Sequence, residues 1–487
     1  MKPSMKARLA LFLLLPCFPL VAGQIVTHQA ADIVLGQADF VSSTVPGTPT
    51  AASMSGPTSV AVDPTTGKVF VSDSGNNRVL RFSSANAMLS GSDAEAFFGQ
   101  VSSSSNGHAT TQKELYGPVG IAVDKNGTLW VADSTNNRVL RFDNASAKPA
   151  VAINADGVLG QPNFSTNNAA TPTQATMNSP RSVAVDANGT LWVADTDNNR
   201  VLRFDDAANA INGANADGVL GQPGFTINFG NGLTTQYTMY SPYGVAADAA
   251  GHLWVADSFN VRVLRFDHAA SLSNGALASG VLGQANFVTA TPSSPPTAAS
   301  LAPIGLAVDA AGGLWVGDFG NRRALYFNQA AAKANGAAAD IVIGQTNFTS
   351  KVIATTATGL AAPFGLVVDP TTGALWIADA SNVRALHYTP QTITPPAAAG
   401  ITLAVSGKKK ITTTAAKIVI KGGAACADGV ARVEYRIGKK GGYKVAAGTT
   451  AWRFKAGLKP GKNTITIRAI GAAGQTSSPV VLRVTLQ

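Results

Sequence analysis

The chain is organised as short apolar runs separated by Asn, Asp and Gly turns, and the whole arrangement repeats. The segment VSDSGNNRVLRF recurs as VADSTNNRVLRF, VADTDNNRVLRF and VADSFNVRVLRF, and two looser copies follow, VGDFGNRRALYF and IADASNVRALHY. Successive copies begin 60–62 residues apart. Self-similarity at a fixed period is typical of repeat architectures, so each copy is predicted to be one structural unit.

Each unit predicts four short antiparallel strands. In the second unit a strand over residues 120–124 leads into a Gly turn, and strands over 129–133 and 138–142 follow, separated by a short polar loop. A fourth strand ends in a Gly-Gln pair. The first strands are apolar at nearly every position, which implies cover on both faces, and sheets stacked radially around an axis provide it.

The order of the pieces at the two ends predicts a closed ring. The Gly-Gln strand occurs six times, but its first copy, near residues 33–37, precedes the first complete unit, and no such copy follows Tyr388. The N-terminal strand is therefore predicted to complete the last blade, which removes exposed sheet edges. The sequence indicates an all-β fold, a six-bladed propeller of four-stranded blades across residues 31–389.

The blocks with the pattern GxAVDxxGxLWVADxxNNRVLRF resemble NHL repeats, and the resemblance extends over all six units. This resemblance implies a six-bladed propeller. Members of the NHL family range from protein- and RNA-binding platforms to secreted enzymes such as amidating lyases, and related propellers include lactonases with an axial metal. Loops of 17–19 residues separate each Gly-Gln from the next Pro. We expect these loops to carry function, because a rigid scaffold presents them on one face.

A DxxNxR signature occurs in every unit. Because a site on a pseudo-symmetric ring usually needs unique residues, we interpret this signature as structural, with Asp and Asn ordering a turn and Arg bridging strands as an ion pair. The signature residues are Asp73, Asn76, Arg78, Asp133, Asn136, Arg138, Asp195, Asn198, Arg200, Asp257, Asn260, Arg262, Asp318, Asn321, Arg323, Asp379, Asn382 and Arg384.

Residues that differ between blades are better candidates for a site. The residue after the Pro that opens each first strand is expected at the mouth of the axial channel, and the loop after the repeated Asp belongs to the same face. Blades three to six place there Arg181, Asp197, Tyr240, Tyr243, Phe259, Phe319 and Phe364. One interpretation packs these rings beneath the long loops. The other makes them a recognition patch for a protein or carbohydrate, because aromatic and Arg anchors dominate binding energetics.

Catalytic motifs are scarce. The chain lacks HExxH, CxxC, GxSxG and a phosphate-binding glycine loop, and its five histidines occupy different places in the repeat. An axial metal would need ligands from equivalent innermost positions, where Val, Ala, Gly and Leu stand instead. We therefore expect a non-catalytic binding or scaffold protein with no metal and no cofactor. The alternative is a propeller-axis enzyme of lyase or lactonase type with a bound metal.

The composition changes after the propeller. Residues 390–400 form a Pro-rich linker, and residues 401–487 alternate strictly between apolar and polar positions, as expected for an immunoglobulin-like sandwich. The net charge of +10 is unevenly distributed: residues 24–399 carry 18 basic and 25 acidic side chains, whereas residues 400–487 carry 16 basic and 2 acidic ones. The C-terminal module is therefore expected to attach to an anionic envelope or extracellular polymer.

The N-terminus predicts export. Residues 1–23 have the order of a secretory signal, with Lys2, Lys6 and Arg8 before an apolar run and small residues after it. We expect the signal to be cleaved and the mature protein to be secreted, periplasmic or extracellular, and monomeric. No segment reaches the roughly 20 apolar residues of a spanning helix. Nucleic-acid binding is not expected, because no reader motif is present.

Overall fold

The computed structural model describes residues 23–169, 171–230, 233–391, 402–406, 409–425, 430–439, 442–471 and 476–487. The predicted signal segment, except for its last residue, and most of the predicted linker lie outside these ranges. The described residues from 23 to 391 form one compact unit, and those from 402 onward belong to another. Within the described ranges, no helix has the length and apolarity that crossing a bilayer requires.

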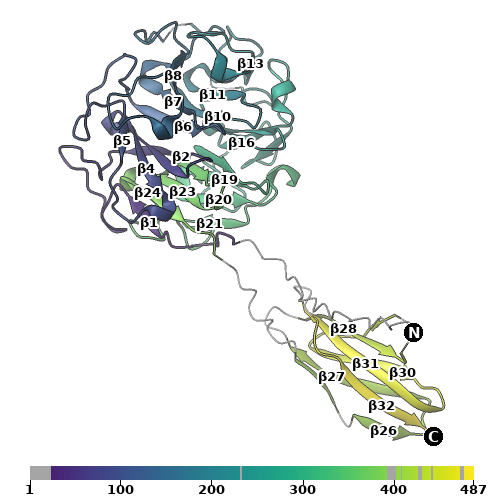
Figure 1. Ribbon diagram of the computed structural model, residues 1–487. Coiled ribbons are helices and arrows are strands. Elements are labelled where there is room, and N and C mark those ends of the chain that lie inside the picture. Colours follow the sequence, from purple (N-terminus) through teal and green to yellow (C-terminus); the bar gives the residue numbers. More distant parts are fainter. Residues whose placement is uncertain are drawn as a thin grey trace, which may run out of the picture. The chain divides into compact units, whose positions relative to one another are not determined.

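The first unit is a ring of six four-stranded antiparallel sheets, or blades, shown in Figure 1. Each blade runs from a first strand at the axis to a fourth strand at the periphery. The complete blades are β2 (Pro57–Val62), β3 (Lys68–Asp73), β4 (Arg78–Ser84) and β5 (Ala96–Phe98); β6 (Pro118–Val123), β7 (Leu129–Asp133), β8 (Arg138–Phe142) and β9 (Gly157–Leu159); β10 (Pro180–Val185), β11 (Leu191–Asp195), β12 (Arg200–Phe204) and β13 (Gly218–Leu220); β14 (Pro242–Ala247), β15 (Leu253–Asp257), β16 (Arg262–Phe266) and β17 (Gly280–Leu282); and β18 (Gly305–Val308), β19 (Leu314–Asp318), β20 (Arg323–Phe327) and β21 (Ile341–Ile343).

The sixth blade is shared between the two ends of the propeller. It contains β22 (Pro363–Val368), β23 (Leu375–Asp379), β24 (Arg384–Tyr388) and the N-terminal strand β1 (Ile33–Leu35). Strand β1 pairs antiparallel with β24, with Val34 opposite Leu386. The predicted ring closure is confirmed, and the strand edge of β24 is covered by the chain's own N-terminal segment.

One-turn 3-10 helices connect the strands. Those after each second strand are η1 (Ser74–Asn76), η3 (Ser134–Asn136), η5 (Thr196–Asn198), η7 (Ser258–Asn260), η9 (Phe319–Asn321) and η11 (Ala380–Asn382). Those after the third strands of the first five blades are η2 (Ala85–Ala87), η4 (Ala145–Ala147), η6 (Ala207–Asn209), η8 (Ala269–Ser271) and η10 (Ala330–Ala332).

The hydrophobic core of the propeller is divided into six clusters, one at each interface between neighbouring blades. Blades two to six each contribute the Trp of their second strand, such as Trp192, which is 1% exposed. Blade one has Phe70 at this position. Because every blade is covered on both faces, its strands are apolar at consecutive positions, as the sequence predicted.

The second unit is a sandwich-like pair of sheets. One sheet has the order β25-β27-β30, from β25 (Thr402–Val405), β27 (Lys417–Ala425) and β30 (Ala451–Gly457). The other has the order β26-β32-β31-β28-β29, from β26 (Lys410–Thr413), β32 (Val480–Leu486), β31 (Gly461–Gly471), β28 (Val430–Ile437) and β29 (Lys444–Val445). Both sheets contribute to one apolar core, which includes Trp452 and Phe454 from β30.

Candidate functional site

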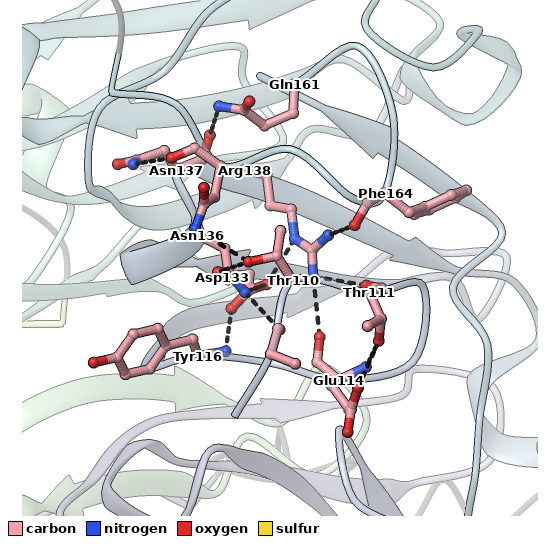
Figure 2. Close-up of polar contacts among 12 residues, drawn as sticks. Thr110, Thr111, Glu114, Tyr116, Asp133, Asn136, Asn137, Arg138, Gln161 and Phe164 are labelled. Carbon is pink, nitrogen blue, oxygen red and sulfur yellow. Dashed lines mark hydrogen bonds and ion pairs between the residues drawn. The ribbon is translucent and has the colours of Figure 1, made fainter. Parts of the chain in front are cut away.

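The repeated DxxNxR signature forms a buried polar network, shown for the second blade in Figure 2. Oδ2 of Asp133 accepts hydrogen bonds from the amide of Asn136 at 2.8 Å and from Nε of Arg138 at 2.7 Å. Its Oδ1 accepts the backbone N–H of Tyr116 at 2.7 Å. The side chains of Asp133 and Arg138 are both 0% exposed. The pair thus lies in a low-dielectric interior where each charge depends on the other.

The arginine of this network also holds the long loops. Nη2 of Arg138 donates to the carbonyls of Thr111 at 2.8 Å and Glu114 at 3.0 Å, in the loop before the blade. Its Nη1 donates to the carbonyl of Phe164, in the loop after it. The arginines that make the corresponding contacts in the other blades are Arg78, Arg200, Arg262, Arg323 and Arg384.

The sequence interpretation of this network was incomplete. It predicted an ion pair that bridges strands, and the ion pair exists in every blade. It did not predict that each Arg fastens two loops, because the acceptors are backbone carbonyls. The available signal was a Phe three residues after five of the six Gly-Gln pairs, whose carbonyl accepts from the Arg: Phe40, Phe164, Phe225, Phe287 and Phe348. The network therefore sets the position of the loops that surround the propeller face.

An axial channel of about 190 Å³ is lined by the first strands of all six blades. Close approach of these strands depends on small residues. A Cβ at Gly305 would lie 1.9 Å from the carbonyl oxygen of Phe364 in the next blade, and one at Gly244 would lie 2.2 Å from that of Ile304. The channel wall is mostly Val, Ala, Leu, Ile and Gly, and its lining contains no His, Cys, Asp or Glu.

One mouth of the channel brings together four of the predicted site residues. Nη1 of Arg181 donates to the hydroxyl of Tyr243 at 2.9 Å across the blade interface, and its guanidinium carbon lies 5.3 Å from the centre of that ring. The Tyr243 ring meets Phe364 edge-on, with centroids 5.4 Å apart, and Phe364 meets Phe319 at 5.7 Å. These residues form a continuous aromatic wall that ends in a guanidinium.

Arg181 has no carboxylate partner among the described residues, and its buried Nε has no hydrogen-bond partner there. Burial raises the pKa of the Tyr243 hydroxyl, and the positive charge of Arg181 opposes this shift. The mouth therefore presents a neutral phenol beside a guanidinium that can donate further hydrogen bonds to an anionic or polar group.

The remaining candidates make no ring contact with this wall among the described residues, although, besides burial, the charge of Asp197 contributes to raising the pKa of the Tyr243 hydroxyl. Tyr240 and Phe259 form a second ring pair, with centroids 5.0 Å apart, and Phe259 is 65% exposed. Phe319 is 37% exposed. The loops therefore leave Phe259 open to solvent rather than covering it. The Asp197 side chain is exposed and makes no hydrogen bond to the other six candidates.

The residues of the channel do not fit an axial metal. None of the five histidines lines it. Across the described ranges, no group of three or more His, Cys, Asp or Glu side chains is arranged to hold a metal ion. His252 instead bonds Asp248 in a hairpin turn at 2.7 Å, and His387 bonds Asp32 at 2.5 Å across the closing strands.

Comparison with known proteins assigns the repeats. The NHL repeat family matches residues 54–82, 115–142 and 177–204, which lie in blades one to three. The first three blades contain NHL repeats. Blades four to six have the same strand order as these blades. They differ at the residue that follows the signature Asn, which is Asn in blades one to three and is Val261, Arg322 and Val383 in blades four to six.

Similar proteins have several activities. The chain is 32% identical over 110 residues to the probable peptidyl-alpha-hydroxyglycine alpha-amidating lyase of Caenorhabditis elegans; the match spans 22% of this chain and 28% of that lyase. A virginiamycin B lyase from Staphylococcus aureus is 13% identical with a TM-score of 0.37, covering 68% of this chain and 80% of that one. An auxiliary nutrient binding protein from Bacteroides thetaiotaomicron is 11% identical with a TM-score of 0.46, covering 74% and 76%. At these values the activities of the solved structures do not transfer to this chain.

Proposed function

We propose that this NHL-repeat protein is an exported, non-catalytic binding protein. Its propeller recognises a protein or carbohydrate partner through one face, and its basic C-terminal module attaches it to an anionic envelope or extracellular polymer. The observation that carries the proposal is the aromatic wall at the channel mouth, which includes the exposed ring of Phe319 and ends at Arg181.

The mouth of the channel differs from blade to blade. Blades one and two have Thr58 and Val119 where blades three, four and six have Arg181, Tyr243 and Phe364. The scaffold needs none of these larger side chains, because the small residues support the same strands. Aromatic rings and arginines without a carboxylate partner are the groups that supply most binding energy at recognition surfaces.

The propeller also provides rigid support for such a surface. The Asp–Arg networks fasten the loop ends on both sides of each blade, so the rings need little ordering when a partner binds. A site that is formed in advance loses less conformational entropy on association.

The test is an array of glycans and peptides probed with the full chain, with Phe319→Ala in the aromatic wall, with Phe259→Ala, and with Thr135→Ala. Phe259 and Thr135 occupy the same repeat position and are both exposed, so Thr135→Ala is a matched control. We expect the strongest signals to weaken about tenfold in Phe319→Ala and to remain in the control, since an anchor residue contributes more than about 1 kcal/mol. A loss in Phe259→Ala as well would extend the recognition surface to the second ring pair. Equal signals in all four proteins would exclude a recognition role for this face.

A further inference from the structure

The outward face of the three-stranded sheet in the C-terminal module carries an unpaired group of positive charges. Strand β27 alternates between inward and outward side chains, and Lys417, Val419 and Lys421 point outward and are exposed. On β30 the outward side chains include Arg453 and Lys455. We call Lys417, Lys421, Arg453 and Lys455 the β27–β30 basic face; both strands are labelled in Figure 1.

The register of the two strands places like charges directly opposite each other. Lys421 is the cross-strand partner of Arg453, and Val419, which is 60% exposed, is the partner of Lys455. Cross-strand partners have Cβ atoms about 5 Å apart, and like charges at that distance destabilise a sheet. No carboxylate of the described chain pairs with any of the four residues.

Three of the arginines in the other sheet of the module have partners within it. Arg432 and Arg468 both pair with Glu434, at 2.8 Å and 2.7 Å. Arg468 and Arg436 also lie over the ring of Tyr443, at 3.9 Å and 4.9 Å. Glu434 and Tyr443 thus hold these arginines, whereas Lys410 and Arg483 of the same sheet face each other without a carboxylate partner in the described chain. No described carboxylate or ring contacts the β27–β30 basic face, so its four charges are open to an external anion.

The shape of the face selects among polyanions. Its aromatic side chains point inward: Trp452 is 2% and Phe454 is 7% exposed. The face therefore offers no ring on which nucleic-acid bases could stack, and a flat sheet face presents no helix to a DNA groove. Lys417 and Lys421 are about 13 Å apart along the strand, so the charges form a short extended row. We propose that the β27–β30 basic face binds a linear anionic polysaccharide of the polyuronate type, which carries a carboxylate on each sugar.

This inference rests on the proposed attachment role of the module and assigns it a surface and a ligand class. The experiment measures binding of the full chain to immobilised alginate in 20 mM and 200 mM salt, with neutral dextran as the blank. It compares the wild type with Lys417→Gln/Lys421→Gln/Arg453→Gln/Lys455→Gln and with a charge-matched control, Lys410→Gln/Lys439→Gln/Lys462→Gln/Arg483→Gln. The control removes four exposed charges in or beside the five-stranded sheet.

We expect the wild type to bind alginate but not dextran, and to bind less tightly at the higher salt. Each exposed ion pair contributes about twofold or more to affinity, so the β27–β30 variant should bind at least about tenfold less tightly, and the control should stay within about threefold. The variant should melt no lower than the wild type, because the like charges that oppose each other are gone.

Three other outcomes would contradict the inference, each for a different reason. Equal weakening in both quadruple variants would show that overall charge, not this face, binds the polymer. Binding of single-stranded poly-dT as tight as binding of alginate would exclude the polysaccharide class. If the wild type binds neither polymer, the proposed attachment role fails with the inference; recognition by the propeller is tested separately by Phe319→Ala.

Discussion

The Asp–Arg network predicts that Arg138→Met destabilises the propeller strongly and releases a specific loop. Arg138 is 0% exposed, and its loss leaves the buried carboxylate of Asp133 without a cation. Removing one partner of a buried pair costs about 3–5 kcal/mol. Three loop carbonyls, those of Thr111, Glu114 and Phe164, also lose their donor. We therefore expect the free energy of unfolding to fall by about 4 kcal/mol.

Urea unfolding followed by tryptophan fluorescence measures this loss, and trypsin measures the release of the loop. Lys113 is exposed between two residues that Arg138 holds, so cleavage after Lys113 should accelerate in Arg138→Met. The control is Arg141→Met, on the same strand, which pairs with the exposed Asp143 at 3.1 Å and donates to the carbonyl of Ala208 but holds neither neighbour of Lys113, so cleavage after Lys113 should stay at the wild-type rate. A loss below about 1 kcal/mol for Arg138→Met, or trypsin sensitivity equal to that of the control, would refute the reasoning.

Three further predictions follow from particular residues. Gly305→Ala should destabilise the propeller by about 3 kcal/mol in urea unfolding, because its Cβ would overlap the carbonyl of Phe364, whereas Gly47→Ala, with open space around it, should be neutral. Val261→Asn should stabilise the propeller by about 1 kcal/mol and raise its melting temperature. Val261 has φ 46°, a left-handed conformation that Asn adopts more easily than a β-branched residue, and the equivalent positions of blades one to three have Asn. An unchanged or lower melting temperature would contradict this. Asp32→Asn should lower stability by about 1 kcal/mol at pH 7. Burial opposes ionisation of Asp32, but hydrogen bonds from His387 and Thr389 outweigh it and lower its pKa. The difference in unfolding free energy between Asp32→Asn and the wild type should therefore persist above about pH 3.9 and shrink as the pH falls below it.

Much of the fold follows from repetition in the sequence. Six copies at one period predict the blades, and the extra Gly-Gln strand before the first copy predicts that β1 closes the ring on β24, as it does. The alternation after residue 401 predicts strands of a sandwich. It does not predict their order, because strand partners in such a sheet are distant in sequence and short polar turns fit several orders.

Only part of the candidate site can be predicted from the sequence. Aligning the repeats places Arg181 and Tyr243 at one position of neighbouring blades, and the structure brings them into contact. The pairing of Tyr240 with Phe259 joins the end of a long loop to the turn after the second strand, and the repeat alignment does not predict that contact. The immunoglobulin-like assignment, the export of the chain and its partners remain predictions.

Hydrogen exchange of the full chain, with and without the strongest ligand from the array, tests the central claim that the propeller recognises its partner through the mouth face of blades three to six. We predict that the ligand protects the backbone amides near Tyr243, Phe259, Phe319 and Phe364, and none near Val119 and Thr135 of blade two. Protection confined to blades one and two, or to the opposite ends of the first strands, would contradict it.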